Sequence, residues 1–439
     1  MYVADSRSTP ATAAPAARST RSGRRSALAP TVFALGTVSL VTDVSSEMVT
    51  AVLPLYLVAG LGLSPLGFGL LDGVYNGASA LVRLVGGHLA DRGGRHKPVA
   101  VLGYGLSALC KPLLLLAGSL PAIAAVLAVD RTGKGLRTAP RDALISLASP
   151  GESRGRAFGV HRAMDTAGAL LGPLVAFLIL RQAVDGYDAV FTVSFCVALL
   201  GVLVLLLFVP SRPARPAPAR ATAEGQGAPR ASLKAALALL RVREVRRLAL
   251  CAVLLGLATV SDSFVYLLLQ RRLGVSDRWF ALLPLGTAAA FLLLAVPLGR
   301  LADRVGGWRV FLGGHVALLC VYAALLTGWR GDALPYLVLA LHGAFYAATD
   351  GVLMAAAAGP VPAELRSSGL ALVQTGQALA RFACSIGFGA AWTAWGDRTA
   401  LGTATALLVV CATGALALRP AVPMRGDVPS PANSEERSA

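Results

Sequence analysis

The chain has 439 residues, of which 55% are hydrophobic and only 14% charged, and its formal net charge is +17. A charged fraction this far below the roughly 25% of ordinary soluble proteins, together with a mean hydropathy of +0.66, excludes a sizeable soluble domain. The positive charge does not indicate a nucleic-acid binder, because the basic residues fall in alternate loops rather than on one element.

The apolar stretches are each long enough to cross a bilayer as a helix, which takes about 20 residues. We predict an all-α integral membrane protein with twelve transmembrane helices, arranged as two pseudo-symmetric six-helix bundles. The predicted spans are 31–58, 66–89, 98–118, 121–142, 157–180, 189–209, 248–269, 279–301, 309–328, 333–356, 368–392 and 399–418. Lys and Arg gather in the loops on the side of both termini, so the positive-inside rule places these termini in the cytoplasm, in a bacterial inner membrane.

A Pro- and Ala-rich basic segment, SRPARPAPARATAEGQGAPR, separates the sixth span from the seventh and is typical of a flexible linker. The predicted organisation is a disordered cytoplasmic N-terminal tail (1–29), an N-terminal bundle (30–210), a cytoplasmic linker with an amphipathic helix (211–247), a C-terminal bundle (248–420) and a disordered C-terminal tail (421–439). The first span is too long and too acidic for a signal-peptide core, so we expect no cleavage.

Two carboxylates interrupt the first span, in the stretch SLVTDVSSEMVTAVLPLYL. Asp43 and Glu47 are four residues apart, so they share one helix face near the middle of the span. An ionisable group at this depth costs at least ~2.5 kcal/mol on insertion scales and normally faces a partner or a water-filled cavity. Both side chains are therefore predicted to point toward one polar region.

The second span carries a polar stripe that includes Asp72 and Asn76, again one helical turn apart. Such a stripe either flanks a cavity or forms a polar seam against a neighbouring helix, and the sequence leaves both interpretations open.

The two halves of the chain share sequence. GHLADRGG at 87–94 recurs as GRLADRVG at 299–306, and ESRGRAFG, beginning at Glu152, is answered at the same offset by ELRSSGLA, beginning at Glu364. Two matches in one register indicate an internal repeat of six helices.

At these residues the chain resembles the major facilitator superfamily of secondary transporters, over about residues 30–420. GHLADRGGRHK is similar to that superfamily's G-x-L-x-D-R-x-G-R-R/K signature between its second and third helices. The resemblance implies an inner gate that is made and broken as the two halves rock; the alternative is a charged inner loop held by topology alone. The expected gate residues are Gly87, Asp91, Arg92, Gly94, Arg95, Lys97, Gly299, Asp303 and Arg304.

The fifth span carries a glycine pattern that resembles the motif of drug/proton antiporters in this superfamily, which favours export. Its residues are Gly159, Gly168, Gly172 and Pro173. Small residues on one face also allow any two helices to approach closely, and Ala176 and Phe177 replace the closing Gly-Gly of the motif, so packing alone remains an alternative. SSEM, DRTGKGLRTAPRDAL and RGRAFGVHRAMDTAG look like a bacterial and archaeal subgroup whose substrates are mostly unassigned.

The resemblance implies that the first, fourth, seventh and tenth spans line a central cavity. The candidates for proton coupling or substrate contact are Asp43, Glu47, Asp72, Asn76, Arg131, Lys134, Asp262 and Asp350. We expect Glu47 to carry the proton and Asp43 to hold Arg131; the alternative is that both acids belong to a static buried salt-bridge network.

Nothing in the sequence indicates an enzyme. The stretch around Lys134 fails the P-loop pattern, no HExxH is present, and the six cysteines lie in spans without metal-ligand spacing. We therefore predict a proton-coupled exporter of a small organic molecule, with no cofactor or metal, acting as a monomer in the lipid bilayer. Proton-coupled uptake, and a non-transporting receptor or assembly protein on the same fold, are the alternatives.

Overall fold

The computed structural model describes residues 29–77, 96–149, 154–183, 186–210, 239–274, 276–329, 331–358 and 366–418. Almost all of these residues are helical. Eight helical stretches in this part of the chain are long and apolar enough to cross a membrane, judged by length and composition. The fold is therefore that of a multi-pass helical membrane protein.

The first group of helices lies at the predicted spans, except that residues 78–89 of the predicted span 66–89 are outside the described residues. Its elements are α1 (Pro30–Leu55) with a π-helical end (Tyr56–Gly60), a helix over 65–77, α3 (His96–Leu116), α4 (Leu120–Ala148), α5 (Arg154–Gln182) and α6 (Gly186–Phe208). The π-helical turn begins just after Pro54, which has no N–H to donate to the α-helical ladder. The α4 helix runs six residues beyond the predicted end of its span at position 142, to Ala148.

The second group departs from the prediction in two places. Its elements are a 3₁₀ turn (Leu239–Arg241), α8 (Arg243–Leu257), α9 (Asp262–Leu273), α10 (Asp277–Phe280), α11 (Leu283–Val305), α12 (Gly307–Leu326), α13 (Leu334–Ala358) and α14 (Arg366–Ala417). The predicted span 248–269 is interrupted at 258–261, so α8 and α9 are separate helices. The predicted spans 368–392 and 399–418 both lie in α14, which breaks at Gly396 (φ 82°).

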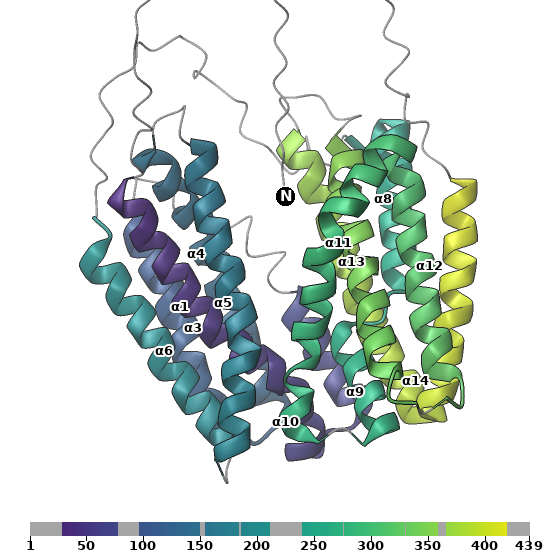
Figure 1. Cartoon of the computed structure of the whole chain (residues 1–439), viewed down its shortest axis with the longest axis horizontal. Helices are drawn as coiled ribbons and strands as arrows, with labels where there is room; N and C mark the ends of the chain where they lie inside the picture. The colour runs from purple at the N-terminus through teal and green to yellow at the C-terminus, as the bar shows by residue number, and fades with distance from the viewer. Residues whose placement is uncertain are drawn as a thin grey trace, which may run out of the picture.

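The helices lie in two groups that separate toward one end of the molecule (Figure 1). In one group α1 packs against α5 and α6, and α3 against α4; in the other, α13 packs against α11 and α12. The short α10 and the neighbouring α9 lie at the opposite end, at the bottom of Figure 1, which we call the α10 end.

The helix over 65–77 joins the two groups through α9 and α14. Phe264 of α9 contacts Phe68 and Phe388 edge to face, with ring centroids 4.9 Å apart in both pairs. A Cβ atom added at Gly73 would lie only 2.9 Å from the ring of Phe382 in α14, so the absence of a side chain there permits the close approach. At the α10 end, the Tyr187 hydroxyl donates to Asp277 at 2.9 Å.

The break between α8 and α9 is held by one tyrosine of α12. The hydroxyl of Tyr322 accepts a hydrogen bond from the N–H of Val260 at 2.8 Å and donates to the carbonyl of Ala258 at 3.1 Å. Backbone groups inside a membrane must find partners in the protein, because the hydrocarbon offers none. Tyr322 therefore satisfies the opened helix and fixes the start of α9 at Asp262.

Tyr322→Phe is expected to lower the free energy of unfolding by about 1–3 kcal/mol, because two buried backbone groups lose their partner. The measurement is thermal unfolding of the purified protein in detergent. Tyr336→Phe on α13 is the matched control, since Tyr336 is 75% exposed. Equal melting of the two variants would contradict the role of Tyr322.

Candidate functional site

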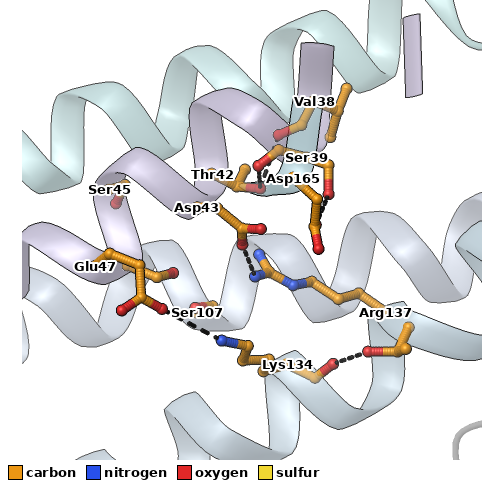
Figure 2. A network of polar contacts seen from close by, with 12 residues as sticks. Val38, Ser39, Thr42, Asp43, Ser45, Glu47, Ser107, Lys134, Arg137 and Asp165 are labelled. Carbon is orange, nitrogen blue, oxygen red and sulfur yellow. Dashed lines mark hydrogen bonds and ion pairs between the residues drawn. The ribbon is translucent and has the colours of Figure 1, made fainter. Parts of the chain in front are cut away.

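The α1 helix presents Asp43 and Glu47 to the basic face of α4, as predicted from their spacing (Figure 2). α1 is held in this position by α5. A Cβ atom at Gly172 would lie 2.6 Å from the Cβ of Glu47 and 2.9 Å from the backbone nitrogen of Met48, and one at Gly168 would lie 3.0 Å from the Cα of Leu40. Two residues of the glycine pattern thus bring α5 against the helix that carries the acids.

The other two residues of that pattern do not share this contact. Gly159 has no described atom within 4 Å of the position that its Cβ would occupy. Pro173 lies inside α5 and is buried next to Gly172.

Asp43 pairs with Arg137 of α4. The Nη2 atom of Arg137 donates to Oδ1 of Asp43 at 3.3 Å, and its guanidinium lies over the ring of Tyr104, 4.5 Å from the centroid. The predicted pair between Asp43 and Arg131 was wrong. Arg137 lies six residues closer to the end of α4 and occupies the position beside the carboxylate.

Arg131 is instead bound to its sequence neighbour Asp130. Arg131 donates from Nη2 at 2.6 Å and from Nε at 3.1 Å to one carboxylate oxygen of Asp130. The other oxygen accepts from Lys111 of α3 at 2.8 Å and from Ser107 at 2.6 Å. The guanidinium of Arg131 also lies over the ring of Tyr75, 3.7 Å from the centroid.

Asp130 and Lys111 were not among the residues selected from the sequence. Lys111 could have been identified from the sequence, because it is a lysine within the apolar run LSALCKPLLLL. A charge buried in such a run requires a partner. Asp130, Lys111 and Arg131 are all buried, so they form an ionic cluster sealed from solvent.

The pair between Glu47 and Lys134 differs from these buried pairs. Its closest N···O distance is 3.8 Å, beyond hydrogen-bonding range, and the two side chains are 27% and 34% exposed. Figure 2 shows both side chains reaching toward one another from α1 and α4. Of the two acids of α1, Glu47 therefore has the longer ion pair and the more exposed side chain.

Asp72 and Asn76 form a polar seam rather than part of this cluster. Asp72 is buried and accepts a hydrogen bond from Ser385 of α14 at 2.5 Å. Asn76 donates to the Asp72 backbone carbonyl at 2.9 Å and to its side chain at 3.3 Å. The contact ties the first helix group to the second.

In the second group, Asp262 is the first residue of α9 and accepts a hydrogen bond from the hydroxyl of Tyr346 on α13. The Nε2 atom of His342 lies 3.6 Å from the same carboxylate oxygen. Asp350 lies one turn beyond Tyr346 and is exposed. His342 was missed because an isolated histidine in an apolar span carries no recognisable spacing.

The expected inner gate is described only in part. Gly87, Asp91, Arg92, Gly94 and Arg95 lie outside the described residues, as does the side chain of Asp303. Lys97, in the first turn of α3, donates to the carbonyls of Leu206 at 2.9 Å and Val209 at 2.6 Å, so it caps the end of α6. Gly299 and Arg304 lie in the second half of α11.

Comparisons with known proteins agree with this architecture. The Major Facilitator Superfamily model matches residues 35–385. An uncharacterised transporter of this type from Methanocaldococcus jannaschii is 28% identical over 373 residues, which cover 83% of this chain and 89% of that protein. An uncharacterised Mycobacterium tuberculosis protein is 38% identical over 157 residues, covering 36% of this chain and 38% of its own length.

Solved structures with the same fold include a nucleoside transporter, with a TM-score of 0.74 at 14% identity, covering 88% of this chain and 98% of that one. A bacterial homologue of the human lysosomal transporter Spinster, inward-facing and unoccupied, has a TM-score of 0.72 at 15% identity, covering 88% and 96%. Identities this low show the shared fold alone.

Gly172→Ala is expected to destabilise the protein by about 1–3 kcal/mol, because the added methyl group forces α5 away from Glu47 and Met48. Gly159→Ala, on the same helix but in open space, is the control and is expected to be neutral or stabilising. Thermal unfolding of both variants in detergent provides the comparison. Equal stability of the two would contradict the close contact between α5 and α1.

Asp130→Asn is expected to cost about 3–5 kcal/mol, because it leaves Lys111 and Arg131 buried without their counter-charge. Asp142→Asn is the control, since Asp142 pairs with Arg141 at the half-exposed end of α4 and such pairs contribute about 0–1 kcal/mol. The yield of folded protein and its melting temperature are the readouts. An Asp130→Asn protein as stable as the control would overturn the role of the ionic cluster.

Proposed function

The chain belongs to the major facilitator superfamily and is a membrane transporter, and from this premise we propose that it couples the export of a small organic molecule to proton entry. In this proposal the protein is a monomer that crosses a bacterial inner membrane twelve times, with both termini in the cytoplasm. Two pseudo-symmetric bundles, 30–210 and 248–420, are joined by the cytoplasmic linker 211–247 in this proposal.

The observation that carries the proposal is the loose ion pair of Glu47 and Lys134. Unlike Glu47, Asp43 and Asp130 accept hydrogen bonds from their basic partners: Asp43 from Arg137, and Asp130 from Lys111 and Arg131. Glu47 is partly exposed and 3.8 Å from its partner, so a proton can reach it at small structural cost. A neutral Glu47 no longer attracts Lys134, and the freed ammonium can then bind a polar group of the cargo.

Transport by rocking of two bundles requires contacts that close one end at a time. The helix over 65–77 meets α9 and α14 through Phe68, Phe264 and the Asp72–Ser385 hydrogen bond, while the groups separate away from the α10 end. Basic residues lie where α6 and α11 end, remote from α10: Lys97 caps the end of α6, and Arg304 lies in the last turn of α11. In this proposal the positive-inside rule places that end in the cytoplasm, so the two groups separate toward the cytoplasm.

In this proposal the signature at 87–97 and its second copy at 299–306 form the inner gate, which closes when the two groups come together at the cytoplasmic end. Its residues are those named from the sequence: Gly87, Asp91, Arg92, Gly94, Arg95, Lys97, Gly299, Asp303 and Arg304. The glycine pattern of α5 supports export, although Gly168 and Gly172 also serve packing against α1. Uptake would use the same acids in the opposite direction, and the vesicle experiment below separates the two.

Glu47→Gln is expected to reduce substrate-driven proton flux at least tenfold, because the amide cannot bind and release the coupled proton. The protein is reconstituted in liposomes with an internal pH-sensitive dye, and pooled candidate compounds are added on one side at a time. The sign of the pH change and the side of addition together report whether the compound and the proton move in opposite directions.

Glu244→Gln is the matched control, since Glu244 is the only other glutamate in the described part of the chain and lies in the first turn of α8. It is expected to retain wild-type flux. Equal flux from wild type and Glu47→Gln would overturn coupling at Glu47. Cargo movement in the same direction as the proton would support uptake, and no flux from any pool would favour a non-transporting protein.

A further inference from the structure

The second helix group contains a fully buried histidine whose ring nitrogens have no hydrogen-bond partner among the described residues. His342 lies in the middle of α13 with no exposed surface. Its Nε2 atom is 3.6 Å from Oδ1 of Asp262, which is close enough for an ion pair but too far for a hydrogen bond. A neutral imidazole has one donor and one acceptor to satisfy, and neither has a hydrogen-bond partner in the described part of the chain.

Aromatic rings enclose His342 and exclude water from it. The ring stacks on Phe345, with an interplanar angle of 6°, and meets Tyr346 and Tyr266 edge on, with centroids 5.3 and 6.0 Å away. The hydroxyl of Tyr266 is engaged with Thr287 at 2.9 Å, and that of Tyr346 with Asp262. Neither tyrosine hydroxyl is therefore directed to the imidazole.

Asp262 lies beside this enclosed ring and is itself partly exposed. Its side chain is 42% exposed, whereas that of His342 is 1% exposed. The carboxylate lies at the start of α9, directly after the break that Tyr322 holds open. One oxygen atom faces both Tyr346 and His342, and the carboxylate as a whole remains accessible.

The charged and titratable groups near His342 come from four helices. Asp262 lies on α9, Arg381 on α14 with its guanidinium 5.9 Å from the ring centroid of Tyr346, and Asp350 on α13 itself, two turns away. His315 of α12 contacts the far side of Phe345 and bonds its own helix backbone through Nδ1. Asp262 is the one of these that lies within 4.0 Å of the His342 ring nitrogens.

We propose that His342 and Asp262 form a second proton-binding site, in the helix group that does not contain Glu47. A proton from water binds the exposed carboxylate of Asp262 and then moves to Nε2 of His342, which leaves a carboxylate facing an imidazolium. The imidazolium then donates a hydrogen bond to Oδ1, which requires the 3.6 Å separation of the two atoms to shorten by about a few tenths of an ångström. The hydroxyl of Tyr346 donates to the same oxygen. The proton leaves by the reverse path.

This site deepens the proposed function, since it rests on the protein being a proton-coupled transporter, but its occupancy can be measured without any substrate. A pair that is hydrogen-bonded only when the proton is present changes the contact between α9 and α13. Because α9 also contacts Phe68 through Phe264, the proton would bias the junction between the two helix groups.

The test is NMR of the full-length protein in lipid nanodiscs, with ring ¹⁵N-labelled histidine, between pH 4 and 9. The chain has only five histidines, so the signal lost in His342→Phe identifies His342. Phe fits the aromatic surroundings, and His342→Gln provides a second assignment if the first variant folds poorly. We expect the His342 signal to change from neutral imidazole to imidazolium within this range.

Asp262→Asn is expected to abolish the change of His342 from imidazole to imidazolium, or to move the midpoint of that change by at least one pH unit. Asp332→Asn, in the exposed turn that precedes α13, is the control and should leave the His342 signal close to wild type. A His342 signal that stays neutral throughout, or that responds identically in Asp262→Asn, overturns the proposal. Loss of liposome flux in Glu47→Gln does not bear on this result, so failure of either site is seen separately.

Discussion

Asp130 of α4 receives hydrogen bonds from two cations, Lys111 of α3 and Arg131 of α4, and all three side chains are buried. Charges in such surroundings persist only when they are paired, because the hydrocarbon supplies neither counter-charge nor hydrogen bonds. By binding Arg131, Asp130 leaves Arg137 as the partner of Asp43 and Lys134 as the partner of Glu47. The distribution of bases along α4 thus gives Asp43 a hydrogen-bonded partner and leaves Glu47 with a longer ion pair of 3.8 Å.

The geometry of this charge arrangement depends on helix packing that involves no charge. Gly168 and Gly172 let the backbone of α5 lie against α1, so the position of Glu47 is coupled to the position of α5. The end of α5 in turn contacts α10, through Phe177 and Trp279, with ring centroids 5.2 Å apart. A movement of α5 against the second group would therefore displace Glu47 relative to Lys134, which is how a rocking motion and a protonation step can influence one another.

The second helix group places its acid, Asp262, at a break between two helices. Tyr322 satisfies the opened backbone at this break, and Asp262 begins the next helix. A break of this kind is tolerated in a membrane only when side chains replace the missing backbone bonds. The result is a partly exposed carboxylate beside the enclosed ring of His342, just as Glu47 is a partly exposed carboxylate on α1.

The sequence by itself determined the helical membrane class, the superfamily resemblance that the comparisons confirmed, and the shared face of Asp43 and Glu47. These follow from hydropathy and from spacing within one helix, which are local properties. It did not determine that Asp43 pairs with Arg137, that Asp130 takes Arg131 and Lys111, or that His342 lies beside Asp262. Those pairings depend on the rotation and axial register of one helix against another, which are fixed by contacts such as Gly172 against Glu47. Only the tertiary structure decides them, because side-chain packing between helices, unlike periodicity along one, leaves no repeat in the sequence.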